Sequence, residues 1–170
     1  MNAQLKTFKD TVNTRQILIG AAGLIVGALV YLVDRSPDHA YFVYRSGIDI
    51  SLYNVLPNLF GPIGHSLPAF SHVFSFILIT AGLIGCRKRG YLIICLSWFI
   101  VDCTFELGQK FKSSAVRIIP DWFAGIPYLE NTSNYFFHGT FDYFDLVAII
   151  IGAVLAYITL SHTIRGVRKS

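Results

Sequence analysis

Charged residues are scarce in this sequence. Asp, Glu, Lys and Arg make up 14% of the 170 residues, whereas soluble domains carry about 25%. Hydrophobic residues make up 54%, so few polar side chains remain to cover a solvated surface. This balance excludes a disordered tail, a soluble enzyme of ordinary composition and a free nucleic-acid-binding domain. We expect one small membrane domain over residues 1–170, with no nucleic acid among its partners.

Cysteine is scarce as well. The three cysteines, Cys86, Cys95 and Cys103, are odd in number and form no Cys-x-x-Cys pair. This excludes a disulfide framework and gives no zinc signature, so we expect these residues to act as small apolar side chains. The sequence also lacks a glycine-rich phosphate loop, a nucleophile elbow and an HExxH motif. The motifs therefore predict no cofactor.

Long apolar runs are what the sequence does contain. Four of them are near the length of about 20 residues that a helix needs to cross the hydrocarbon core. They cover about residues 17–33, 67–84, 91–107 and 141–160. Helices are expected because an open strand would leave its backbone groups unpaired in lipid. No A-x-A cleavage site follows the first run, which we interpret as a retained anchor. The sequence predicts an all-α, four-helix, multi-pass membrane bundle.

The basic residues predict how these helices are oriented. Lys and Arg concentrate on the cytoplasmic side of membrane proteins. Both terminal segments and the connection at residues 85–90 carry more of them than the two longer loops do. We therefore expect both termini in the cytoplasm, and loops 34–66 and 108–140 outside the cell membrane. The residues on the expected inner side are Lys6, Lys9, Arg15, Arg87, Lys88, Arg89, Arg165, Arg168 and Lys169, and those outside are Arg35, Arg45, Lys110, Lys112 and Arg117.

Both outer loops are rich in aromatic residues. Such rings suit the headgroup zone of a bilayer, because each combines an apolar body with a polar edge. Trp122 and its neighbours predict a short interfacial or re-entrant element over residues 119–130. In the first loop, the pattern over residues 48–59 predicts a short amphipathic helix lying on the membrane.

Small residues recur at helical spacing in two of the runs. Gly23 and Gly27 stand four apart in the first, and Ala148, Gly152 and Ala156 do so in the fourth. Such stripes let helix backbones approach closely. We expect them to pack helices within one bundle, and a homo-oligomer is the other assembly that they allow.

Polar residues follow helical spacing in the third run. Asp102, Glu106 and Gln109 stand at i, i+4 and i+7 near its end, so they share one face of a helix. The fourth run begins with Asp142 and Asp145. Because successive helices alternate in direction, Asp102 is expected near the middle of the bilayer. The other four residues are expected in the outer half of the bundle: Glu106, Gln109, Asp142 and Asp145.

The second run places two histidines, His65 and His72, at the same expected depth. Acids inside a membrane helix are costly and generally carry function, and two close carboxyl groups can act as general base and general acid. We expect these residues to form one outward-facing polar site with Glu106 close to Asp145. The candidate catalytic residues are Glu106, Asp145 and His72, and the candidate binding residues are Gln109, Asp142, Asp102 and Trp122.

Structural roles are the alternative for the same residues. Asp142 can cap the fourth helix, Glu106 and Gln109 can form hydrogen bonds between helices, and His72 can be a packing residue. His72, Glu106 and Asp145 offer atoms that bind metal ions, but no spacing requires one, so no metal site is predicted.

These motifs resemble the VanZ-like family of small membrane proteins. The resemblance covers about residues 65–160. It rests on His72 in SHVFSF, on Glu106 and Gln109 in FELGQ, and on GTFDYFDLVAIIIGA, which contains Asp142 and Asp145. Ile149 stands where the family usually has Asn, and Gly139-Thr140 occupy the region of a common Arg. The resemblance implies a cell-envelope role connected with lipid-linked wall or surface glycans and with susceptibility to teicoplanin-type glycopeptides.

Two hypotheses follow. In the first, the polar site binds or acts on the head of a membrane lipid or lipid-linked glycan, and the aromatic loop around Trp122 guides that ligand in. Glu106 or Asp145 would then act as base, with the partner carboxyl or His72 as acid. In the second, the protein is a non-catalytic accessory or binding protein whose acids serve helix packing and capping. The variant Glu106→Gln separates the two, because it keeps the size of the side chain but removes its acid–base capacity.

Overall fold

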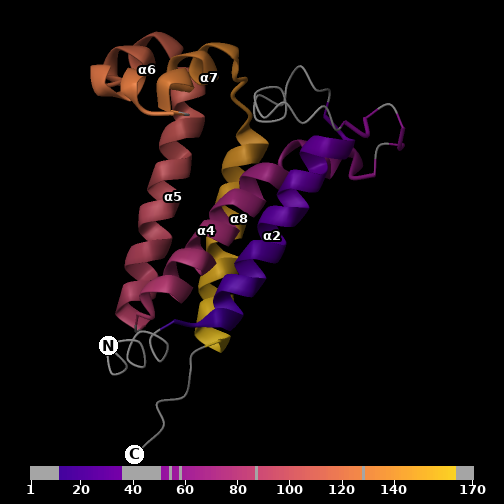
Figure 1. Cartoon of the computed structure of the whole chain (residues 1–170), viewed down its shortest axis with the longest axis vertical. Coiled ribbons are helices and arrows are strands. Elements are labelled where there is room, and N and C mark those ends of the chain that lie inside the picture. Colours follow the sequence, from indigo (N-terminus) through magenta and orange to yellow (C-terminus); the bar gives the residue numbers. More distant parts are fainter. Residues whose placement is uncertain are drawn as a thin grey trace, which may run out of the picture.

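The computed structural model describes residues 12–35, 51–53, 55–57, 59–86, 88–127 and 129–163, and all regular structure within them is helical. Four helices are long and apolar enough to cross a membrane: α2 (Thr14–Val33), α4 (Leu67–Ile84), α5 (Lys88–Lys110) and α8 (Tyr143–His162). They run side by side as a bundle (Figure 1). The predicted all-α architecture with four candidate membrane spans is confirmed.

The ends of the helices differ from the predicted runs by a few residues, and local capping explains the differences. Asn13 caps α2, where its side chain accepts a hydrogen bond from the Gln16 N–H, so the helix begins before the apolar run. Asp142 caps α8 in the same way, which moves its first residue to Tyr143. Gly85 ends α4 with φ of 62°, a left-handed conformation that glycine adopts without strain.

Helix α4 lies at the centre of the bundle. It packs against α2, α8 and α5, and α5 also packs against α8. The small residues allow these contacts: Gly23 and Gly27 face Ser75 and Ser71 of α4, and Gly152 of α8 faces the backbone of Phe70. The predicted small-residue stripes therefore lie against neighbouring helices of the same bundle, as the sequence analysis favoured.

A buried polar network closes one end of the bundle, where α2 begins and α8 ends. The Gln16 side chain is fully buried, and its amide group donates hydrogen bonds to the hydroxyl groups of Tyr91 (3.3 Å) and Thr163 (3.0 Å). The Asn13 amide group donates to the Thr163 carbonyl (3.0 Å), and the Asn13 N–H donates to the Gly82 carbonyl (2.8 Å). These contacts join the ends of all four long helices. We call this the α4–α5 turn end.

Short helices cover the opposite end, which we call the α6–α7 end (Figure 1). The predicted interfacial element at residues 119–130 contains two 3-10 turns, η3 (Asp121–Gly125) and η4 (Leu129–Asn131). They lie between α6 (Lys112–Ile118) and α7 (Thr132–His138), which pack against each other and against the end of α5.

The first loop is described only in part. The turn η2 (Gly61–His65) leads into α4. Asp34, at the end of α2, accepts hydrogen bonds from the N–H groups of Leu59 (3.0 Å) and Phe60 (2.9 Å), which holds this loop against α2. The amphipathic helix predicted over residues 48–59 falls partly outside the described residues, and residues 51–53 and 55–57 form turns, a bend and irregular backbone.

Candidate functional site

The polar stripe of α5 is confirmed as one buried face. Asp102, Glu106 and Gln109 are 8%, 6% and 7% exposed. Each of the three contacts a different partner element: Asp102 contacts α4, Glu106 contacts the start of α8, and Gln109 contacts α7. The stripe therefore joins α5 to three other elements, which are α4, α7 and the start of α8.

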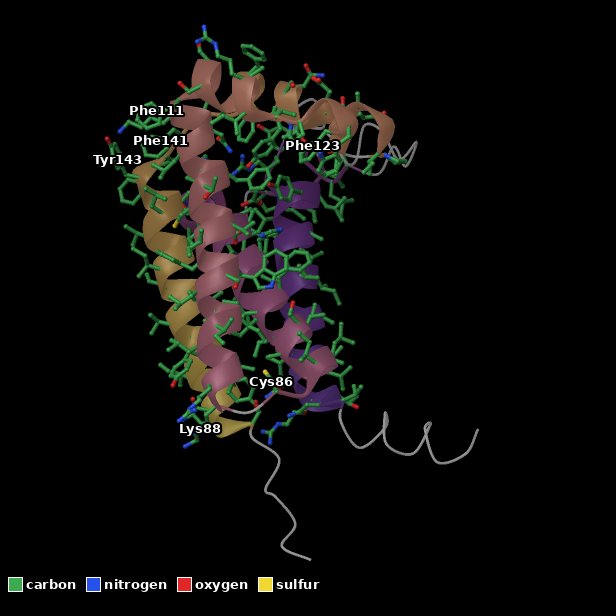
Figure 2. The ribbon with its side chains drawn as sticks, turned by 90° about the vertical axis from the view of Figure 1, so that its left-hand side faces the viewer. Cys86, Lys88, Phe111, Phe123, Phe141 and Tyr143 are labelled. Atoms are coloured by element: carbon green, nitrogen blue, oxygen red, sulfur yellow. The ribbon has the colours of Figure 1, made fainter. Side chains whose placement is uncertain are left out.

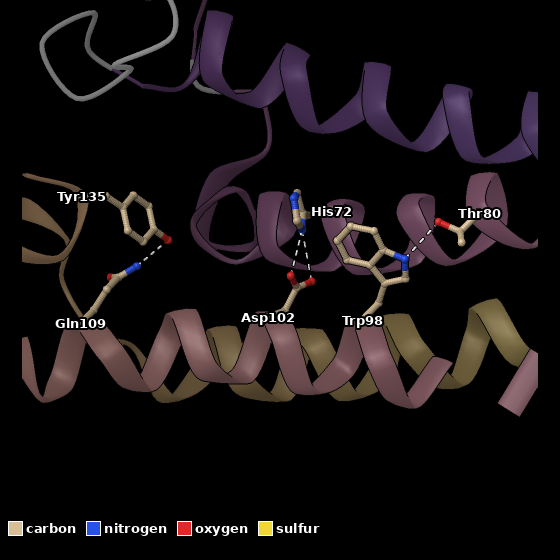
Figure 3. A network of polar contacts seen from close by, with 6 residues as sticks. All are labelled: His72, Thr80, Trp98, Asp102, Gln109 and Tyr135. Atoms are coloured by element: carbon tan, nitrogen blue, oxygen red, sulfur yellow. Dashed lines mark hydrogen bonds and ion pairs between the residues drawn. The ribbon is translucent and has the colours of Figure 1, made fainter. Parts of the chain in front are cut away.

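Asp102 forms a close pair with His72. The His72 Nδ1 atom lies 3.1 Å from both carboxylate oxygens of Asp102 (Figure 3). A carboxylate in this position fixes the orientation of the ring and favours the proton on Nδ1. The Asp102 side chain is 9% exposed, whereas that of His72 is 49% exposed. The edge of the ring with Nε2 is therefore the part of this pair that a ligand can reach.

Aromatic rings surround the His72–Asp102 pair. The ring centroid of His72 lies 4.4 Å from that of Phe76 and 6.1 Å from that of Trp98, and the Phe76 and Trp98 rings are stacked at 4.8 Å. The Trp98 N–H donates to the Thr80 hydroxyl group at 3.0 Å, which holds the indole in place (Figure 3). The imidazole therefore lies beside an apolar wall.

Glu106 and Asp142 make contacts that position the start of α8. The Asp142 N–H donates to Glu106 Oε1 at 2.9 Å, and Asp142 Oδ1 accepts from the Phe144 N–H at 2.9 Å. The second contact is the helix cap that the sequence analysis gave as an alternative role for Asp142. Both carboxylates thus satisfy backbone donors that a helix start leaves unpaired.

Asp145 lies one turn further along α8. Its carboxyl group accepts a hydrogen bond from Ser66, and Arg35 and His65 lie near enough to act on it electrostatically. The Asp142 and Asp145 charges both act on Glu106. Asp145 Oδ1 is buried and has no hydrogen-bond partner among the described residues.

Gln109 holds a residue that the sequence analysis did not select, Tyr135 of α7. The Gln109 side-chain amide donates to the Tyr135 hydroxyl group at 2.7 Å (Figure 3). Tyr135 is 48% exposed, and partial desolvation of its hydroxyl group, together with the nearby Glu106 charge, raises the pKa of Tyr135 to about 12. Because its oxygen accepts from Gln109, the Tyr135 hydroxyl proton remains available to a second partner. No spacing distinguished Tyr135 from the other aromatic residues of its loop.

Trp122 lies apart from these contacts, and His65, which lies near Asp145, makes a hydrogen bond through its backbone. Trp122 is 61% exposed on η3, where its ring packs against Phe123. The carbonyl group of His65 accepts a hydrogen bond from Arg35 at 2.8 Å. Within the described residues, no group of three His, Cys, Asp or Glu side chains is placed to hold a metal ion.

Comparison of the chain with protein-family models, with curated proteins and with solved structures finds no match. The helices themselves define the class: an all-helical protein with four helices that are long and apolar enough to cross a membrane.

Proposed function

We propose that the protein is a multi-pass protein of the cell membrane, with both termini in the cytoplasm and the α6–α7 end outside. The distribution of charge supports this orientation. Of the 14 Lys and Arg residues, nine fall in the two terminal segments and the α4–α5 connection, where Figure 2 labels Lys88, and five fall in the two longer loops. Lys and Arg are retained on the cytoplasmic side during insertion.

We further propose that the polar site binds the head of a membrane lipid or of a lipid-linked glycan. The His72–Asp102 pair is the observation that carries this proposal. His72 lies five residues after the start of α4, or about 8 Å along its axis. Asp102 pairs with Nδ1 of His72, so within the described residues Nε2 has no hydrogen-bond partner, and a polar atom at such a depth is costly unless a partner reaches it. The head of a lipid is the polar group that is available there.

The residues behind the VanZ-like resemblance support a common site. These residues come from three helices, and each makes a contact between elements of the bundle: His72 from α4, Glu106 and Gln109 from α5, and Asp142 and Gly152 from α8 and its cap. We therefore extend the proposal to a cell-envelope role that affects susceptibility to teicoplanin-type glycopeptides.

Specific contacts favour the non-catalytic alternative for two of the acids. Glu106 accepts the Asp142 N–H, and Asp142 caps α8. Both carboxylates are engaged in holding the start of α8, which suits packing and capping better than proton transfer. If the site is catalytic, His72 is the acid–base candidate that these contacts leave accessible, with Asp102 as the residue that positions it.

Glycopeptide susceptibility tests the proposed role. A sensitive Gram-positive host would express the wild type, Asp102→Asn, Glu106→Gln, or the exposed control Asp121→Asn at matched membrane levels. We expect protection against teicoplanin from the wild type and the control, and its loss in Asp102→Asn. If Glu106→Gln still protects the host, Glu106 has a packing role. If this variant folds but no longer protects, Glu106 acts as an acid or base. A wild type that gives no protection would contradict the glycopeptide role.

Lipid retention tests the binding site separately. Lipids extracted from the purified wild type and from His72→Ala would be compared by mass spectrometry, with Tyr53→Ala as an exposed aromatic control. We expect a lipid or lipid-linked species that is enriched in the wild type and the control but depleted in His72→Ala. Equal lipid content in all three proteins would contradict binding at His72.

A further inference from the structure

An exposed segment of the α6–α7 end has no part in the polar site. It consists of Phe111, α6, η3 and Ile126, and we call it the α6–η3 arm. No residue of α6 or η3 is buried. The arm lies across the end of α5 rather than along the bundle (Figures 1 and 2). It is therefore at the depth where the long helices end, which is the headgroup depth of a membrane that they cross.

Large apolar side chains on the arm are free of protein contact over much of their surface. Ile118 is 78% exposed, Trp122 is 61% exposed and Phe111 is 58% exposed. Such residues are unfavourable in water but suit the membrane interface, where Trp in particular is enriched. Their exposure indicates that lipid, and not solvent alone, contacts this surface.

Basic residues accompany the apolar ones. The Lys112 ammonium group donates to the Phe137 carbonyl at 2.9 Å. The Lys110 ammonium group donates to the Tyr143 hydroxyl group at 2.9 Å and lies 4.8 Å from the centroid of the Phe141 ring. Both cations are thus held at the end of the bundle by groups that carry no negative charge.

Arg117 differs from these two lysines. It is exposed on α6, and within the described residues its guanidinium group has no hydrogen-bond or ion-pair partner. The next acid along the arm is Asp121, the first residue of η3. A planar guanidinium group pairs well with the oxygens of a phosphate.

We propose that the α6–η3 arm binds the headgroups of anionic phospholipids on the membrane surface beside α5. Arg117 and Lys112 attract the phosphate groups, while Ile118 and Trp122 enter the interface between them. This surface is separate from the His72–Asp102 pair, so the proposal stands independently of the ligand of that pair. It requires only that the four long helices cross a bilayer.

Trp122 provides the measurement, because the chain has two tryptophans and the other is Trp98. The full chain with Trp98→Phe would be placed in nanodiscs of phosphatidylcholine and phosphatidylglycerol, with brominated acyl chains on one lipid or the other. Brominated lipid quenches tryptophan fluorescence at short range. At equal mole fractions, we expect brominated phosphatidylglycerol to quench Trp122 more strongly than brominated phosphatidylcholine, and this preference to weaken at high salt.

Arg117→Gln is the matched variant, since the Arg117 side chain has no hydrogen bond or ion pair to lose within the described residues. We expect the preference for phosphatidylglycerol to fall about fivefold, the effect of one cation near an anionic surface. Lys88→Gln, at the other end of the bundle, should leave it unchanged. Helical circular dichroism would verify the fold of each variant. Equal quenching by both lipids in the Trp98→Phe protein, absence of quenching, or a preference unaltered by Arg117→Gln would each overturn the proposal.

Discussion

Asp102 on α5 holds His72 on α4 through both of its carboxylate oxygens, each 3.1 Å from the imidazole Nδ1. The acid is buried and the histidine is half exposed. One residue therefore fixes the orientation of the ring, while the other presents Nε2 to whatever approaches the bundle.

Removing this carboxylate should free the imidazole. In Asp102→Asn, the amide can either donate to or accept from Nδ1, so we expect a mixture of His72 tautomers instead of one. The free energy of unfolding should fall by roughly 1 kcal/mol, the difference between a hydrogen bond to a charged group and one between neutral groups. Nitrogen-15 NMR of labelled histidine and thermal unfolding in detergent measure the two effects. Asp121→Asn, on the exposed η3 turn, should change neither; unchanged tautomers in Asp102→Asn would contradict the pairing.

The contact between Gly23 and Ser75 should tolerate no added methyl group. A Cβ atom at position 23 would overlap the Ser75 hydroxyl group, so Gly23→Ala should separate α2 from α4 and destabilise the protein by about 1–3 kcal/mol. The double variant with Ser75→Gly should recover part of this loss. Gly125→Ala is the control, because a Cβ atom there would have no neighbour within 4 Å. Equal thermal stability of the two alanine variants would contradict a stabilising role for the close contact between Gly23 and Ser75.

Tyr135 should make stability depend on alkaline pH. Its pKa is raised from 10.0 to about 12 in the folded protein. The folded state therefore keeps this proton more tightly than the unfolded state, and stability should decline as pH rises from 10 towards 12. Melting temperatures of the wild type and Tyr135→Phe across this window measure the effect. Their difference should change with pH, and parallel curves for Tyr135→Phe would contradict the raised pKa.

The proposed orientation can be tested with two exposed positions at opposite ends of the bundle. In a variant with Cys86, Cys95 and Cys103 replaced by Ala, a cysteine would be introduced by Ser113→Cys or by Arg89→Cys. A membrane-impermeant maleimide applied to intact cells should label the first variant and not the second. Labelling of both after lysis is the control for accessibility, and the reverse pattern in intact cells would invert the assigned topology.

The four helices could be predicted because length and apolarity alone decide whether a segment suits a bilayer. The α5 stripe could be predicted because Asp102, Glu106 and Gln109 are spaced for one helix face. The partner of each polar residue could not be predicted from the sequence. Several acids share the depth of His72, and the choice of Asp102 depends on the rotation of α4 and α5 about their axes, which spacing leaves open.

Other contacts had no signal in the sequence. Gln16 is a single amide at the edge of an apolar run, and its partners Tyr91 and Thr163 lie far from it along the chain. Tyr135 lies in a segment with many aromatic residues, where composition indicates the membrane interface but selects no individual ring. Both depend on how the helix ends meet, which is a property of the assembled bundle.

The distribution of partners along the α5 stripe sets an order for biogenesis. Helix α5 is the least apolar of the four candidate spans. When it leaves the ribosome, the partner of Asp102 already exists, because His72 belongs to the preceding helix. Glu106 and Gln109 must wait for Asp142 and Tyr135, which are synthesised later. A nascent chain that ends shortly after α5 therefore has the partner of one of its three polar side chains, and the other two gain theirs only when α7 and α8 arrive.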